Sequence, residues 1–316
     1  MKALTPIAAA ILIASSGSVL AANNTTLQSQ LGAGNMATST QVGPGNVNNL
    51  VIQTQVGNFN DSNALQTFGS DTNIVLHTQT GNQNNATSSQ FGGSLNTASV
   101  FQVGNGNTGI TTQSAPAFAS AAFINQGGDV NVGFITQAAS AFDVAAVNQL
   151  GTANFSTITQ TLSVGNSATS NQAGNANISN IAQILALGNT AVANQAGTLN
   201  LSSHIQTGVL NNSNSSQLGT LNFTSALQAG LGNDSQTLQS GFGNLSAHTQ
   251  VGSFNDALTA QAGLVNVSSI TQTGLGHDAA TTQVGLANTH TTLQFGSNET
   301  AVASQVGVAN VGFILQ

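Results

Sequence analysis

A glutamine recurs in this sequence at a nearly constant spacing, and that spacing constrains the fold more than any other feature. From Gln30 to Gln316 it occupies 26 positions, and 17 of them open a strict Q-x-G-x-x-N motif. The stretch QLGTLNFTSALQAGLGNDSQTLQSGFGN, which starts at Gln217, contains three of these motifs, each beginning eleven positions after the last. A fixed period of this kind indicates a stack of repeats rather than separate globular domains.

The spacing also contains a longer period. Before Gln195, intervals of eleven alternate with intervals of twelve to fourteen, and after it every interval is eleven. Because only every second turn accepts extra residues, two kinds of turn must alternate along the chain. The repeating unit is therefore two strands and two turns, or two glutamine intervals, and the 26 glutamines make about 13 such units.

The segment between two turns has the composition of a β-strand. From Asn to Gln it is seven residues long, as in Asn222 to Gln228, which is a usual strand length. It is rich in Thr, Val, Ile, Leu and Phe, and it shows no helical periodicity. Gly and Asn at the turn positions tolerate positive φ angles. We expect an all-β fold, a β-solenoid of about 13 two-strand rungs with amyloid-like stacking, about 4.8 Å from rung to rung.

The Asn and Gln of one segment lie six residues apart and therefore share one face of the strand. Mostly small residues lie between them on that face, which lets two sheets approach closely, so we expect the face to point inward. Stacked amides can bond to identical amides in the rungs above and below, which satisfies their polar groups. The expected ladder in the regular half consists of Gln195, Asn200, Gln206, Asn211, Gln217, Asn222, Gln228, Asn233, Gln239, Asn244, Gln250, Asn255, Gln261 and Asn266. The expected turn glycines are Gly197, Gly208, Gly219, Gly230, Gly241, Gly252 and Gly263.

The first residues have the features of a secretory signal peptide. Lys2 supplies the positive charge, residues 7–14 form a short apolar run, and residues 19–21 form a small-residue cleavage site. We expect a signal peptide over 1–21, with cleavage after Ala21 or Ala22, and a repeat domain over 22–316. The predicted location is extracellular.

The charge pattern excludes several classes of protein. Lys2 is the only basic residue, against eight acidic residues and five histidines. Once the expected signal peptide is removed, the mature chain has no Lys or Arg with which to neutralise phosphates, so we expect no nucleic-acid partner. We also expect no insertion into a membrane. There is no cysteine, so no disulfide framework supports the fold. No catalytic constellation or phosphate-binding loop stands out from the repeat, so we expect no enzyme activity and no cofactor.

The repeat resembles the curlin repeat, S-x5-Q-x-G-x2-N-x-A-x3-Q. The runs QAGNANISNIAQ, from Gln172 to Gln183, and QVGLANTHTTLQ, from Gln283 to Gln294, carry its skeleton, and the resemblance extends from Asn23 to Gln316. It implies a secreted subunit of curli, the bacterial functional amyloid fibre (a pilus or fimbrium type) of cell adhesion and biofilm matrix. It also implies partners: other copies of the chain stacked end to end, a nucleator subunit and an outer-membrane secretion pore.

Two features differ from the family pattern. The chain has more repeats than the family's major subunit, and the segment from Asn24 to Gln30 already fits the strand template where the family carries a non-repeat addressing segment. The resemblance implies that a nucleating subunit would carry some basic residues near its end. The C-terminal segment VGVANVGFILQ has none, which favours a major or structural subunit. Neither terminal strand has a polar cap, so we expect both end rungs to recruit further strands.

Two outward-facing rows of the predicted rod have contrasting chemistry. One contains an acidic ladder of Asp234, Asp256 and Asp278, one repeating unit apart, in which mutual repulsion should raise the pKa of at least one carboxyl group. The other begins apolar and is a candidate lateral contact surface or an ordinary exposed strand row; it contains Leu201, Phe223, Leu245, Val267, Thr289 and Val311.

The five histidines do not predict a metal site. His204 and His248 should lie in one column, two rungs or roughly 10 Å apart, which is too far to share one ion. We expect no carboxylate or thiol beside any of the five at ligand distance. The alternative function that the sequence leaves open is a non-polymerising extracellular β-solenoid binding module, either an adhesin or an ice-binding rod.

Overall fold

The structure, a computed structural model, describes residues 23–316, and it contains 26 β-strands in this range. The predicted signal peptide over 1–21 lies outside the described residues. Among residues 23–316, no helix is long and apolar enough to cross a membrane.

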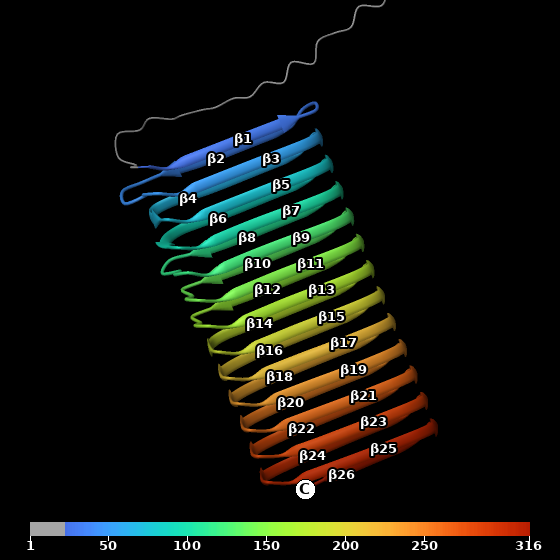
Figure 1. Cartoon of the computed structure of the whole chain (residues 1–316). Helices are drawn as coiled ribbons and strands as arrows, with labels where there is room; N and C mark the ends of the chain where they lie inside the picture. Colours follow the sequence, from blue (N-terminus) through green and yellow to red (C-terminus); the bar gives the residue numbers. More distant parts are fainter. Residues whose placement is uncertain (1–22) are drawn as a thin grey trace, which may run out of the picture.

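The strands coil into a flat rod of two facing parallel sheets (Figure 1). Odd-numbered strands form one sheet: β1 Thr25–Leu31, β3 Leu50–Asn58, β5 Ile74–Asn82, β7 Thr97–Asn105, β9 Ala121–Asp129, β11 Val144–Thr152, β13 Ser167–Asn175, β15 Thr190–Thr198, β17 Asn212–Thr220, β19 Asp234–Phe242, β21 Asp256–Leu264, β23 Asp278–Leu286 and β25 Thr300–Val308. Even-numbered strands form the other: β2 Met36–Val42, β4 Asp61–Asp71, β6 Asn85–Ser94, β8 Thr108–Ser114, β10 Val132–Ala138, β12 Phe155–Thr161, β14 Ile178–Leu187, β16 Leu201–Val209, β18 Phe223–Leu231, β20 Leu245–Ser253, β22 Val267–Leu275, β24 Thr289–Ser297 and β26 Val311–Leu315.

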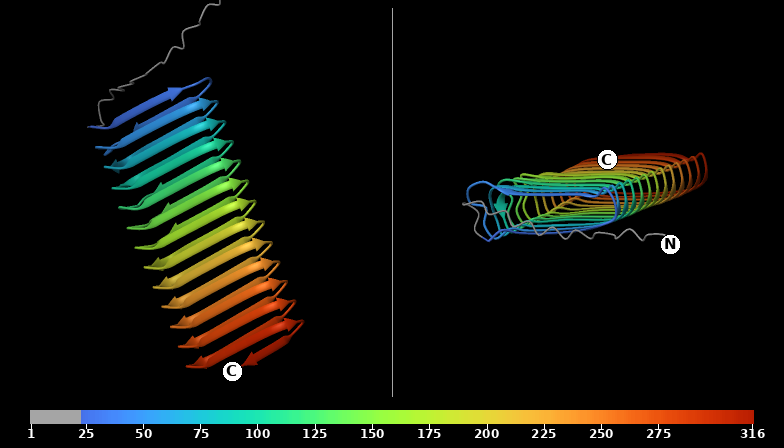
Figure 2. Two further views of the ribbon diagram at one scale, coloured as in Figure 1. Left: turned by 45° about the vertical axis from the view of Figure 1, so that its right-hand side comes forward. Right: turned by 90° about the horizontal axis from the view of Figure 1, so that it is seen from above.

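Each sheet has 13 strands, so the predicted β-solenoid of about 13 two-strand rungs is confirmed. The register places each repeat glutamine over the next one, for example Gln217 over Gln239 and Gln239 over Gln261. The rod seen along its axis is a narrow, closed outline with one layer of strands on each side (Figure 2).

The interior between the sheets is thin and mixed in polarity. Small residues such as Ala145, Ala168 and Ser170 are fully buried there, beside the glutamines. A row of larger apolar side chains, including Ile158 and Ile181, occupies the middle rungs. Because the buried residues are mostly small, the two sheets approach closely enough for side chains of one to reach the backbone of the other.

The strands are longer than the predicted seven-residue segment. In the regular half they are mostly nine residues long, begin just after the Asn and continue past the Gln and the Gly, as in Phe223–Leu231. The sharp reversal occurs at the residue before the next Asn, which adopts a left-handed conformation; φ is +56° at Leu199 and +58° at Leu221. The repeat glycines therefore close the strands, and the turn itself uses a residue other than glycine in most turns.

The two kinds of turn lie on opposite edges of the rod (Figure 1). The turns that accept extra residues all precede odd-numbered strands, and in the N-terminal half they form a short additional row of parallel bridges. That row joins Ser94, Phe118, Ala141, Val164 and Leu187. Extra residues thus lengthen one edge. In β4 and β14 they form a bulge after the repeat glutamine, and the glutamines themselves stay in register.

Candidate functional site

Two files of glutamine side chains run the length of the interior, one for each sheet. In the odd-numbered sheet, Nε2 of Gln195 donates to Oε1 of Gln217 at 2.9 Å, Gln217 donates to Gln239 at 3.0 Å, and Gln239 donates to Gln261 at 2.8 Å. Every bond in the file points the same way, from a rung to the rung that follows it in the chain. The even-numbered sheet repeats this geometry through Gln206, Gln228 and Gln250 at 2.8 and 2.9 Å.

The glutamines beyond the first rung also tie the two sheets together. The second N–H of Gln228 donates to the backbone carbonyl of Asn212 at 2.7 Å and to that of Asn233 at 3.0 Å. Gln239 donates likewise to the carbonyl of Phe223 at 2.9 Å. A fully buried amide is costly unless it is paired, and here both its oxygen and its nitrogen have partners. The glutamine files therefore hold rung to rung and sheet to sheet at once.

The asparagines form two further files at the turns, and these files run in the opposite direction. Asn222 donates through Nδ2 to Oδ1 of Asn200 at 3.1 Å and to the carbonyl of Gly241 in the following rung at 3.2 Å. The backbone N–H of Asn222 also donates to Oδ1 of Asn200, at 3.1 Å. Equivalent bonds join the remaining predicted members, namely Asn244 and Asn266 on this edge and Asn211, Asn233 and Asn255 on the other.

The repeat glycines are required by the packing of one rung on the next. At Gly219, φ is +121° and an added Cβ would lie 2.1 Å from the carbonyl oxygen of Gly241. Real Cβ atoms do not approach a backbone oxygen so closely, and φ in this region is strained for any other residue. The same contact, at 1.8 to 2.1 Å, occurs at Gly197, Gly208, Gly230, Gly241, Gly252 and Gly263.

The three aspartates predicted as an acidic ladder lie directly over one another. Asp234 pairs with Asp256 and Asp256 pairs with Asp278 in the register of β19, β21 and β23. Partial burial, and then the negative charges of the two neighbours, raise the pKa of the middle carboxyl group, Asp256. Asn212, in the rung before Asp234, donates to Asp234 Oδ1 at 3.1 Å.

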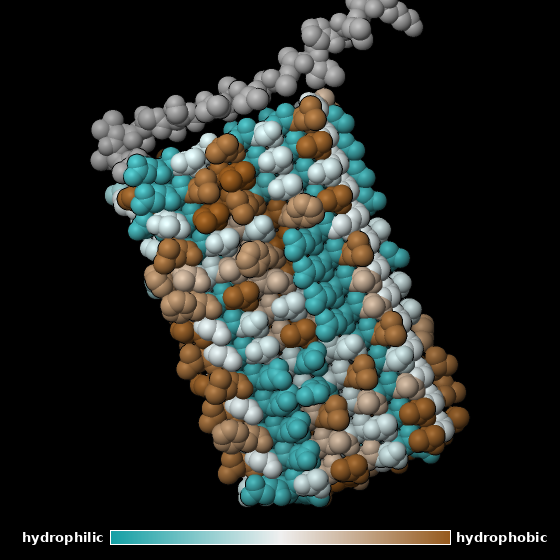
Figure 3. Space-filling model, viewed as in Figure 1, coloured by the Kyte–Doolittle hydropathy of each residue, from teal (hydrophilic) through white to brown (hydrophobic). Residues whose placement is uncertain are grey.

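The predicted apolar row also stacks in register but is only partly exposed. Leu201, Phe223, Leu245 and Val267 are half-buried, whereas Val311 in the terminal rung is 82% exposed. The space-filling view shows hydrophobic and hydrophilic residues arranged in rows along the rod, with hydrophobic side chains also gathered at its edges (Figure 3).

Three strand histidines are fully buried between hydroxyl groups of the two sheets. Nε2 lies 2.7 Å from Ser88 Oγ in His77, 2.9 Å from Ser215 Oγ in His204, and 2.7 Å from Thr259 Oγ1 in His248. Burial lowers the pKa to about 3 at His77, about 4 at His204 and about 3 at His248. All three are neutral at neutral pH and act as hydrogen-bonding core residues.

The expectation that no carboxylate lies beside a histidine is wrong at one position. His277 and Glu299 occupy successive rungs of a turn file that holds mostly asparagines, and His277 Nδ1 lies 3.4 Å from Glu299 Oε2. The pair is not apparent along the chain, because the two residues meet only where the turns of successive rungs stack. In residues 23–316, no group of three or more His, Cys, Asp or Glu side chains could hold a metal ion.

The same turn file contains a buried carboxyl group, at Asp143. Its side chain accepts a hydrogen bond from the backbone N–H of Asn166 at 2.7 Å and another from the hydroxyl of Ser163. Burial raises the pKa of Asp143 despite these two donors. Here an aspartate replaces an asparagine as acceptor for the following rung.

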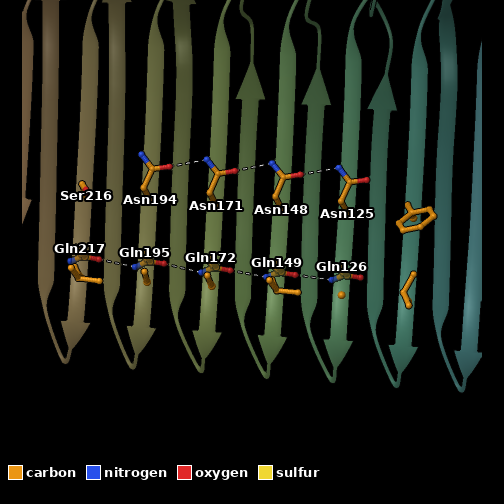
Figure 4. Close-up of a pocket in the computed structure, with 17 residues that line it drawn as sticks. Asn125, Gln126, Asn148, Gln149, Asn171, Gln172, Asn194, Gln195, Ser216 and Gln217 are labelled. Atoms are coloured by element: carbon orange, nitrogen blue, oxygen red, sulfur yellow. Dashed lines mark hydrogen bonds between the residues drawn. The ribbon is translucent and has the colours of Figure 1, made fainter.

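A further amide ladder, which was not predicted from the sequence, lies on the outer face of the odd-numbered sheet (Figure 4). Nδ2 of Asn125 donates to Oδ1 of Asn148, Asn148 donates to Asn171, and Asn171 donates to Asn194, each at 2.8 Å. The ladder borders a shallow groove of about 510 Å³. Its sequence signal is an Asn directly before the repeat glutamine, recurring in four successive odd-numbered strands.

The fold and its four internal files define the chain as a β-solenoid protein with an amide-laddered core. No protein-family model and no curated protein matches this chain.

Proposed function

We propose that this protein is a secreted, self-assembling structural subunit of curli-like amyloid fibres that serve cell adhesion and biofilm matrix. The observation that carries the proposal is the common direction of the internal glutamine files. A file of donors that all point the same way has a free acceptor at one end of the rod and a free donor at the other.

Within the described residues, the terminal rungs show these free groups. Gln305 accepts from Gln283 and donates to the carbonyl of Thr289, so its remaining N–H has no partner among residues 23–316. At the opposite end, Gln30 donates to Gln55, and its Oε1 accepts no bond from any described residue. The strands β25 and β1 are also the two edges of one sheet, and β26 and β2 are the edges of the other. Unpaired strand edges recruit further strands.

A second copy would continue both sheets without a change in pattern. Placing β1 of one copy after β25 of another sets Gln30 over Gln305, and placing β2 after β26 sets Gln41 over Gln316. Donor then meets acceptor in each glutamine file. Stacking in the reverse sense would bring donors to donors, so the fibre has one polarity, head to tail.

The repeat glycines supply a substitution that separates stacking from folding. In inner rungs an added Cβ would strike the glycine carbonyl of the following rung, but at Gly307, in the last rung of its sheet, it would meet only Asn310 Nδ2 at 3.5 Å. A following copy would place the carbonyl of Gly32 against it. Gly307→Ala should therefore leave the rod folded and block growth at this end.

The test is negative-stain electron microscopy and thioflavin fluorescence of the purified full chain after removal of denaturant. We expect the parent protein to form fibres, and G307A to give short rods of parental circular dichroism that do not elongate. A folded chain that remains monomeric under these conditions would contradict the proposal and support the non-polymerising binding module. Elongation of G307A at the parental rate would refute stacking through this rung.

A further inference from the structure

The groove on the outer face of the odd-numbered sheet is formed by two rows of side chains across β7 to β17 (Figure 4). The amide row precedes the repeat glutamines and consists of Phe101, Asn125, Asn148, Asn171, Asn194 and Ser216. The packing row follows the glutamines and consists of Val103, Gly127, Leu150, Ala173, Ala196 and Leu218. The register stacks each residue of a row over the next.

The packing row complements the same row of a second rod if that rod faces the first with its rungs in the opposite order and with Ala173 opposite Ala173. In that arrangement Leu150, which is 66% exposed, faces Ala196 of the other row, and Leu218, 58% exposed, faces Gly127. Facing large residues with small ones is how two sheets pack closely. If the second rod were placed so that the centre of reversal lay midway between β13 and β15, Leu150 would instead face Leu218, and two large side chains would meet.

The amide row matches itself about the same rung. Asn171 faces its own copy, Asn148 faces Asn194, and the exposed Phe101 faces Leu238, the next member of the row on β19. Each ladder amide uses one N–H and one oxygen lone pair within the ladder. The remaining N–H and lone pair can bond to an amide across the interface.

We propose that a second copy of this chain covers this face, related by a two-fold axis that lies in the interface, directly over β13 and parallel to it, so that two rods pair side by side with opposite polarity. A two-fold axis makes each contact twice, which is the rule for dimer interfaces built from one surface. Pairing of this kind does not require end-to-end stacking, and it adds a lateral contact to the proposed fibre.

Charge and area both fit a second copy. The amide and packing rows carry no ionisable side chain from β7 to β19, and the antiparallel arrangement keeps the two acidic ladders at opposite ends of the interface. Three outward rows span seven rungs here: the packing row, the amide row, and the row two residues before the amide row, which runs from Ser99 on β7 to Gln236 on β19. Together they cover roughly 600 Å² on each copy from strand spacing and residue rise. The total of about 1,200 Å² reaches the lower limit of specific interfaces.

A linear polymer fits the groove less well. A chain lying along the packing row would have to pass over Leu150 in the middle, and Val103 and Leu218 stand at the two ends. The protruding side chains of Leu150 and Leu218 would obstruct a continuous ligand, whereas a second copy in reversed order places small residues opposite them.

The test uses single cysteines, because the chain contains none of its own. Ala173→Cys places the thiols of two paired rods opposite each other, whereas Ala262→Cys, in the same row four rungs away, places them about 38 Å apart, or about 24 Å at the nearest along stacked rods. A short bismaleimide linker should join A173C into covalent dimers and leave A262C unjoined. Linking of both variants, or of neither, would overturn the proposal.

A second pair of variants tests the protruding side chain of Leu150 against a control leucine outside the proposed interface. Leu150→Asp, added to A173C, should abolish linking through the introduced thiol and convert paired filaments into single ones, while Leu185→Asp, at an equally exposed leucine on the long-turn edge, should change neither. Unchanged linking with L150D would refute the pairing. The pairing would also be refuted if A173C formed no dimers by itself and an added β-glucan oligosaccharide protected its thiol from a labelling reagent. That result would show that the groove binds a ligand instead. Chains that never form fibres can still give the dimer band, so this result is independent of the proposed function.

Discussion

Two neighbouring glycines, Gly241 and Gly243, make a sharp test of how one rung packs on the next. An added Cβ at Gly241 would lie 2.0 Å from the carbonyl oxygen of Gly263, at a φ of +121°. At Gly243, with φ of +67°, it would lie 3.7 Å from Val265 Cγ2, which is an ordinary contact. The same substitution to alanine is therefore a steric collision at one position and a modest conformational strain at the other.

The two costs differ enough to measure. For Gly243→Ala, a left-handed alanine costs about 1–2 kcal/mol, and the less flexible unfolded chain offsets about 0.4–1 kcal/mol of it, which leaves a destabilisation of about 1 kcal/mol. For Gly241→Ala, backbone strain of about 1–3 kcal/mol is joined by displacement of the Gly263 carbonyl. That carbonyl accepts from Asn244 Nδ2 at 3.1 Å, and loss of a buried bond costs about 1–3 kcal/mol. The sum is about 2–6 kcal/mol.

The assay is guanidinium unfolding of the full chain, followed by circular dichroism, with hydrogen exchange to locate the disturbed rungs. We expect G241A to lower the unfolding midpoint far more than G243A and to expose amides in the rungs on both sides. Equal shifts for the two variants would refute the account of glycine as a packing requirement between rungs.

Three further outcomes follow from the buried amides and ionisable groups. Gln239→Glu, which removes donors and buries a charge, should destabilise the rod by at least about 3 kcal/mol. The control Gln236→Glu, exposed on the same strand, loses only a surface bond to Asp234 and should cost at most about 1 kcal/mol; equal unfolding midpoints for the two variants would contradict this. Burial lowers the pKa of His204 to about 4 and of His248 to about 3. The free energy of unfolding should therefore be at its full value above a pH of about 6.5 and fall as the pH drops from there towards 4. A flat profile in a pH series of urea titrations would contradict this expectation. Burial and neighbouring charge raise the pKa of Asp256, which has the opposite sign, so Asp256→Asn should stabilise the rod and speed assembly at neutral pH and lose this advantage in acid, as turbidity kinetics at two pH values can show.

The number of rungs and the inward glutamine face could be predicted because both depend only on period and parity. A constant interval between glutamines, with extra residues in alternate turns, leaves few ways to coil the chain. The offset of six from Asn222 to Gln228 then places both on one face.

The strand limits and the outer surface depended on contacts between rungs, which a linear pattern does not contain. The sequence alone explains Gly219 by the positive φ that glycine tolerates. The stronger constraint on this residue is its contact with the carbonyl of Gly241, one rung away. Likewise, Asn148 has no special neighbour along the chain, and its ladder partner Asn171 becomes apparent only when successive rungs are superposed. Bulky left-handed residues such as Leu199 contradict the usual preference for Gly or Asn at that conformation.

In the solenoid, one chain makes a stack of coils, each lying on the one before, and the mass per unit length of single filaments measures this arrangement. A chain of 31.5 kDa spread over 13 rungs, each rising about 4.8 Å, gives about 0.5 kDa per Å. Scanning transmission electron microscopy should return this mass per unit length for single filaments and twice this value for paired filaments. A value near about 6.6 kDa per Å, one whole chain in each layer of about 4.8 Å, would mean that the chain lies flat in the fibre and would contradict the solenoid.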